Sequence, residues 1–256
     1  MTMKNQAQIL ECALAAGTAK AALPWRRTLA LAMLAGAFIA LGGLLSLIAG
    51  SAAEAPASKR LLSGAVFPIG LILIVTLGGE LFTGNNAVLM PALAAKRTSM
   101  TRVLTNWTLV WLGNFAGALA FVGLFVLGAG TLDAALWHEA AFDLAEAKVS
   151  MPWLTVFCRA IGANWCVCLA VWLAFAAESL TAKCLACWIP VAAFVALGWE
   201  HCIANMFFIP AGIAIGADIS TAQMICNNLI PATLGNIVGG ALLVGCTYTL
   251  LFKAKH

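Results

Sequence analysis

The stretch GWEHCIANMFFIP, residues 198–210, places Glu200 and His201 side by side in the middle of a long apolar region. The sequence before it, KCLACWIPVAAFVAL, and its continuation, FFIPAGIAI, both have the composition of bilayer-spanning segments. Burying ionisable groups in hydrocarbon costs free energy, so such groups inside a span indicate a functional site. The reason why an acid and a histidine lie together in this apolar region therefore bears on both the fold and the function of the chain.

The composition predicts a polytopic membrane protein. The chain is 63% hydrophobic and 9% charged, whereas soluble domains carry about 25% charged residues. The N-terminal residues are polar and lack the apolar core of a cleavable signal peptide, so we expect residues 1–25 to be a cytoplasmic amphipathic segment. The cysteines fall mostly in apolar segments and do not form a zinc motif, which favours a packing role. We expect no metal and no cofactor.

Six apolar segments approach or exceed the roughly 20 residues that cross a bilayer. They are residues 28–49, 61–95, 103–130, 153–177, 183–211 and 227–251. The second and fifth are too long for one uninterrupted span and carry polar residues near their middles. These two are therefore expected to be broken helices.

The basic residues indicate the orientation. With the N-terminus inside, ten basic residues lie on the inner side: Lys4, Lys20, Arg26, Arg27, Lys96, Arg97, Arg102, Lys183, Lys253 and Lys255. The outer loops hold three: Lys59, Arg60 and Lys148. This asymmetry predicts that both termini are cytoplasmic, and we expect the protein in the inner membrane.

Two pairs of motifs indicate an internal repeat. GGELFTGNNAVLMP (78–91) resembles the opening stretch, with Glu80 and Glu200 120 positions apart. Asn114 and Asn236, each in an LGN triplet, lie 122 apart. Three spans per copy require the second copy to enter the membrane from the opposite side. We expect a single all-α membrane domain built from a first repeat (26–130), an outer loop (131–152) and a second, inverted repeat (153–252), with a transport site at the repeat interface.

Five motifs in order resemble the formate/nitrite transporter family. They are GGELFTGNN, NWTLVWLGNFAGAL, GANWCVCLAVW, GWEHCIANMFFIPAGI and NNLIPATLGNIVGGALLVG. The resemblance covers nearly the whole chain, from about Arg26 to Phe252. It implies six-helix protomers with an aquaporin-like inverted-repeat fold and broken second and fifth helices. It also implies a homopentamer in the lipid bilayer, with a pore for small monovalent anions in each protomer.

The resemblance assigns residues at the two helix breaks. His201 matches the central pore histidine, Glu200 the acid beside it and Asn205 the asparagine that follows. The mobile loop of the broken second helix is matched by Leu81, Phe82 and Thr83, and its threonine faces the histidine.

Other positions are assigned to the pore and its mouth. Leu71 resembles the inner apolar constriction, with Phe67 nearby, and Phe194 resembles the outer one. Asn164 resembles a polar residue near the histidine, and Lys148 the basic residue of the outer vestibule. From the residues alone, Lys148 could equally be a solvated loop charge, and the apolar residues could be simple core packing.

The residue chemistry is compatible with this mechanism. An imidazole exchanges a proton near neutral pH, so His201, assisted by the Thr83 hydroxyl, could protonate a weak-acid anion. The neutral acid crosses a dry constriction at far lower cost than the anion. Glu200 could instead point away from the pore and hold the backbone at the break, and we favour that structural role.

The sequence leaves alternatives open for the substrate and for the class of function. NLIPATLGNIVGG and ANMFFIPAGI are closest to formate channels, which makes formate the first expectation. ELFTG, with glycine after threonine, also occurs in nitrite-type relatives, so nitrite or hydrosulfide stays open. Two alternatives come from other classes. Glu80 and Glu200 could form an acidic pair in a cation channel. A membrane-embedded enzyme would need a metal or nucleophile motif, which this sequence lacks. No nucleic-acid partner is expected.

Overall fold

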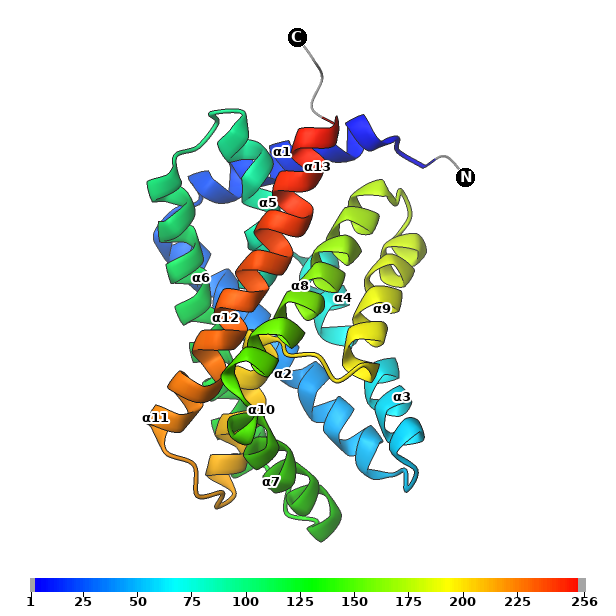
Figure 1. Ribbon diagram of the computed structural model, residues 1–256, viewed down its shortest axis with the longest axis vertical. Coiled ribbons are helices and arrows are strands. Elements are labelled where there is room, and N and C mark those ends of the chain that lie inside the picture. Colours follow the sequence, from blue (N-terminus) through cyan, green and yellow to red (C-terminus); the bar gives the residue numbers. More distant parts are fainter. Residues whose placement is uncertain (1–2, 253–256) are drawn as a thin grey trace.

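The structure is a computed structural model that describes residues 3–252. Over these residues it contains helices and connecting loops (Figure 1). Five helical stretches are long and apolar enough to span a membrane: Trp25–Ser51, Pro56–Leu77, Met100–Gly128, Trp153–Ala176 and Thr221–Phe252. Two shorter apolar helices, Leu180–Ala196 and Cys202–Ala214, together make the remaining broken span.

The first repeat contains three spans. They are α2 (Trp25–Ser51), the broken helix formed by α3 (Pro56–Val66), α4 (Ile69–Leu77) and α5 (Phe82–Ala94), and α6 (Met100–Phe121) continued by the π-helical segment η1 (Val122–Gly128). The helix bends at Pro68 and leaves helical geometry at residues 78–81.

The second repeat has the same three parts. They are α8 (Trp153–Ala176), the broken helix formed by α9 (Leu180–Ala196) and α10 (Cys202–Ala214), and a last span of α11 (Thr221–Gln223), η2 (Met224–Leu229), α12 (Ile230–Ile237), η3 (Val238–Cys246) and α13 (Thr247–Phe252). In Figure 1, α2 starts at the upper end of the molecule, near α1, whereas α8 starts at the lower end, near α7. This opposite entry confirms the inverted repeat and the two broken helices.

Two further helices lie at opposite ends of the bundle. Helix α1 (Gln6–Ala22) lies at the same end as α13, and α7 (Ala135–Ser150) lies at the other end, against α10 (Figure 1). Residues 131–152, expected as an outer loop, therefore consist mostly of a helix. The segment is too polar to span a bilayer, yet its own residues Ala141 and Ala145 are buried.

Glycines permit the breaks and the close packing of the spans. Gly78 and Gly198 have φ angles of +86° and +70°, a region that residues with a Cβ rarely adopt. Gly117 packs directly on the backbone of α2 and Gly239 on that of α8, where an added methyl group would overlap a carbonyl oxygen. These GxxxG faces therefore join helices within one chain.

Candidate functional site

His201 sits at the second break, as the residue that caps α10. Its Nδ1 accepts a hydrogen bond from the backbone N–H of Ala204 at 3.1 Å. A neutral imidazole that accepts at Nδ1 carries its proton on Nε2. Nε2 lies 2.9 Å from Oγ1 of Thr83, so in this tautomer the histidine donates to the hydroxyl. The contact joins the two breaks, and both side chains are buried.

This pair lies between two cavities. A cavity of about 580 Å³ at the α7 end, called the outer cavity after the expected orientation, is lined by His201, Phe194 and Phe67, among others. A second cavity of about 260 Å³ at the α1 end, called the inner cavity on the same basis, is lined by Leu71, by Leu81 and by other residues that flank Thr83 in sequence. An anion passing from one cavity to the other would therefore meet the imidazole and the hydroxyl.

Aromatic rings close the outer side of the histidine. The ring of Phe194 stacks on that of His201, with centroids 5.8 Å apart and planes 23° apart. Phe67 meets Phe194 edge-to-face at 5.8 Å. Phe67, expected near the inner constriction at Leu71, thus lines the outer cavity, and Leu71 lines the inner one.

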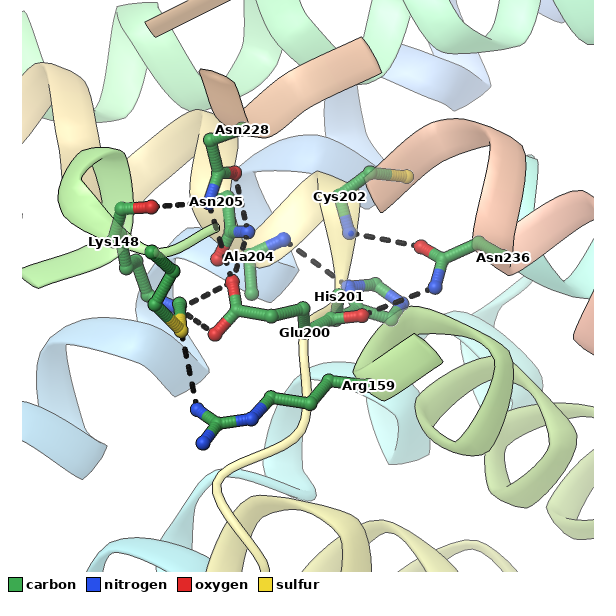
Figure 2. Close-up of polar contacts among 10 residues, drawn as sticks. Lys148, Arg159, Glu200, His201, Cys202, Ala204, Asn205, Asn228 and Asn236 are labelled. Carbon is green, nitrogen blue, oxygen red and sulfur yellow. Dashed lines mark hydrogen bonds and ion pairs between the residues drawn. The ribbon is translucent and has the colours of Figure 1, made fainter. Parts of the chain in front are cut away.

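Glu200 points away from the histidine into a polar network (Figure 2). Lys148 Nζ lies 3.0 Å from each carboxylate oxygen, and Asn205 Nδ2 donates to Oε2 at 2.7 Å. Asn228 adds a longer contact at 3.4 Å and also accepts from Asn205 at 2.6 Å. Lys148 is 7% exposed and Glu200 3% exposed, so this lysine is a buried counter-ion rather than a solvated loop charge.

The first break has an equivalent polar network formed by different residues. Lys20, from α1, contacts Glu80 Oε1, and Asn85 Nδ2 donates to Oε2 at 2.7 Å. Asn85 also donates to Asn106 at 2.9 Å. Each end helix, α1 or α7, thus supplies one lysine to the acid at one break. Both acids of the repeat are charge-paired in this structure.

The asparagines of the two LGN triplets hold the broken backbone. Asn236 accepts from the N–H of Cys202 at 2.9 Å and donates to the carbonyls of Ala160 and Glu200. Asn114 makes the equivalent contacts at the first break, including acceptance from the N–H of Phe82 at 2.9 Å. Backbone groups that leave a helix at membrane depth need such partners.

Asn164 links the two repeats behind the site. Its Nδ2 donates to the carbonyl of Thr83 at 3.1 Å and to that of Asn236 at 2.6 Å. Cys168, one turn along α8, also donates its thiol to the Thr83 carbonyl at 3.3 Å. The position of the threonine is therefore set from the second repeat.

Several residues of this arrangement were not among the candidates from sequence: Lys20, Asn85, Asn106, Asn114, Asn228 and Asn236. Five of them follow the repeat offsets: Asn85 corresponds to Asn205 at 120, and Asn106 to Asn228 and Asn114 to Asn236 at 122. Lys20 had no such signal, because its counterpart Lys148 lies 128 positions away. Within residues 3–252 no group of three His, Cys, Asp or Glu side chains is placed to hold a metal ion.

The inverted repeat, the paired breaks and a polar centre between two cavities define a membrane transport protein. The formate/nitrite transporter family profile matches residues 7–250, and the chain belongs to that family. A relative from Methanothermobacter thermautotrophicus, a probable formate transporter, is 41% identical over 96% of both chains.

Solved structures agree over most of the fold. An FNT family ion channel superposes with a TM-score of 0.88 at 30% identity, covering 95% of this chain and 98% of the other. A pentameric formate channel with formate bound gives a TM-score of 0.82 at 34% identity, covering 90% and 98%. The resemblance that the five motifs indicated is thereby confirmed.

Proposed function

We propose that the protein is a homopentameric channel for small monovalent anions, with formate as the first substrate and nitrite or hydrosulfide as alternatives. The observation that carries this proposal is the buried Thr83–His201 contact between the outer and inner cavities. Support for formate comes from the relative named as a probable formate transporter and from the structural neighbour that binds formate. The pentamer rests on the same neighbour.

The site offers an anion two donors. The Nε2–H of neutral His201 and the hydroxyl of Thr83 can both turn from each other to a carboxylate. Phe194 on the outer side and Leu71 on the inner side exclude water from the passage, which strengthens both hydrogen bonds. A bare anion still pays heavily to cross these apolar residues.

Proton transfer lowers that cost. When His201 is an imidazolium, its Nε2–H bond breaks as an O–H bond forms on the carboxylate, and the neutral acid crosses. The ring keeps its proton on Nδ1, and a hydronium ion in the water of a cavity returns a proton to Nε2 and becomes water. In the imidazolium Nδ1 also carries hydrogen, so the contact from the Ala204 N–H must be released. The charged ring is therefore a transient state of a site built around the neutral one.

A cation channel is less compatible with these contacts. Glu80 and Glu200 each have a lysine ammonium within ion-pair distance. Neither acid is therefore a bare negative charge facing a permeating cation.

The orientation belongs to the same proposal. Both termini lie on the cytoplasmic side of the inner membrane, and α7 faces outward. The excess of basic residues at the α1 end supports this assignment. Accessibility of single cysteines introduced into α1 and α7 of a cysteine-free variant, measured in whole cells, tests it.

Flux into liposomes that contain only this protein tests the function. We expect formate to enter fastest among formate, nitrite, hydrosulfide and acetate, and potassium not to enter. Empty liposomes measure the leak of the neutral acids. Potassium flux equal to formate flux would overturn the proposal, and faster nitrite or hydrosulfide would reassign the substrate.

A further inference from the structure

The outer cavity carries more positive charge than its paired network uses. Four cationic side chains line it, namely Lys59, Arg60, Lys148 and Arg159. The carboxylates that line it are Asp143 and Glu200, and Glu200 is taken by Lys148. The remaining cations belong to α3 and α8, which flank the entrance to the histidine.

The two arginines are available to a ligand. In the described part of the chain, no carboxylate lies within ion-pair distance of Arg60 or Arg159. Both side chains are exposed to the cavity mouth. Arg159 contacts the thioether of Met151 at 3.1 Å. It lines the same cavity as Lys148 and Glu200, with which it is drawn in Figure 2.

Arg60 reaches the second break itself. Its guanidinium lies 3.8 Å from the position that a Cβ on Gly198 would occupy. Gly198 is three residues before His201, so a group bound to Arg60 would stand above the passage. A guanidinium binds a carboxylate through two parallel hydrogen bonds, which a lysine cannot do.

The cavity is much larger than the proposed cargo. Its volume of about 580 Å³ lies in the range of about 300–1,000 Å³ that holds drug-sized molecules, whereas formate has three heavy atoms. Apolar side chains, including Leu47, Trp199 and Phe208, share the lining with the arginines. Charge and apolar surface together fit an anion with a flat apolar body.

We propose that the outer cavity binds aromatic monocarboxylates, with the carboxylate on Arg60 and Arg159 and the ring against the apolar wall. Such a ligand is too large to pass the edge-to-face pair of Phe67 and Phe194, so it blocks the pore from outside. The blocking effect rests on the proposed function, whereas the binding itself does not.

Titration calorimetry of the full-length protein with benzoate measures the binding. At about pH 8 benzoate is ionised, because a carboxyl group titrates near 4. We expect Arg60→Gln together with Arg159→Gln to weaken binding at least about tenfold, as loss of a charge-assisted contact implies. Arg102→Gln, at the opposite end, is the matched control, and benzamide is the neutral ligand control. Unchanged benzoate affinity in the double variant would overturn the proposal.

Flux measurements then test the blocking effect. Benzenesulfonate, which stays ionised, should inhibit formate uptake from outside and have no effect when it is confined to the side of α1. Equal inhibition from both sides contradicts an outer site. Arg60→Lys with Arg159→Lys keeps the charge but removes the paired hydrogen bonds, and its melting temperature shows whether folding survives. Benzoate binding without any formate flux would reject the proposed function and retain this site.

Discussion

At the residue scale, the two neighbours Glu200 and His201 have separate roles. His201 faces Thr83 and the passage, whereas Glu200 turns to Lys148 and Asn205. The backbone at the break has extended geometry at His201, which directs consecutive side chains to opposite sides. The carboxylate of Glu200 thus ties the start of α10 to the end helix α7 and to η2.

Replacing His201 by asparagine separates proton transfer from binding. Asparagine keeps hydrogen bonding but exchanges no proton near neutral pH. Formate flux should fall by about tenfold or more, as expected for loss of an acid–base group, and should lose its pH dependence. Chloride, whose acid is very strong, should not fall in proportion. Currents for both anions across pH 5 to 8, with melting temperature, provide the measurement; equal losses and an unchanged pH profile contradict the relay.

Replacing Thr83 by valine keeps the shape and removes the hydroxyl. A hydrogen bond to a charged group contributes about 1.5–3 kcal/mol, so formate flux should fall by about tenfold or more while the protein still folds. Thr249→Val, which removes another buried hydroxyl far along the chain in α13, should leave the flux near that of the unmodified protein. Unchanged flux in Thr83→Val would remove this residue from the site.

The Lys148–Glu200 pair is testable by a double-mutant cycle. Lys148→Met leaves a buried carboxylate without its ammonium and should destabilise the protein by about 3–5 kcal/mol. Two asparagine amides remain to reduce that cost. Adding Glu200→Gln should recover part of the loss, and the exposed Lys59→Met should cost little. Chemical unfolding in detergent measures each variant; strictly additive losses would mean that the pair is not coupled.

At the element scale, the fold depends on helices that stop inside the membrane. Each break exposes backbone groups, and one asparagine from the third span of the same repeat satisfies them. The end helices add lysines to the neighbouring acids. Both broken helices are therefore held by contacts from elements distant in sequence.

Gly78 tests the conformational requirement of the first break. Its φ is +86°, and an added Cβ would meet no atom within 4 Å. Gly78→Ala should therefore destabilise the protein by about 1–3 kcal/mol through the backbone alone. Gly123→Ala has equally open surroundings and lies in η1, where alanine is the better helix former, so it should not destabilise. Similar unfolding midpoints for the two variants would contradict this account.

At the whole-molecule scale, many large apolar side chains remain exposed on single-chain surfaces, including Leu61, Leu104 and Leu250. Lipid and neighbouring protomers can cover such surfaces. Native mass spectrometry in a mild detergent should show a pentamer, in accordance with the proposed assembly. A stable monomer that still conducts formate would reject the pentamer and keep the single-chain pore.

The sequence by itself determined the membrane class, the inverted repeat and the residues at both breaks. These features follow from local composition and from matched spacing, and both can be read from the sequence without knowing which residues are in contact. Only the tertiary structure decided that Lys148 is buried on Glu200, that Lys20 repeats this role, and that Phe67 belongs to the outer cavity. A side chain's partner depends on how distant helices pack, and the lysines come from end helices that lie outside the regular offset of the repeat.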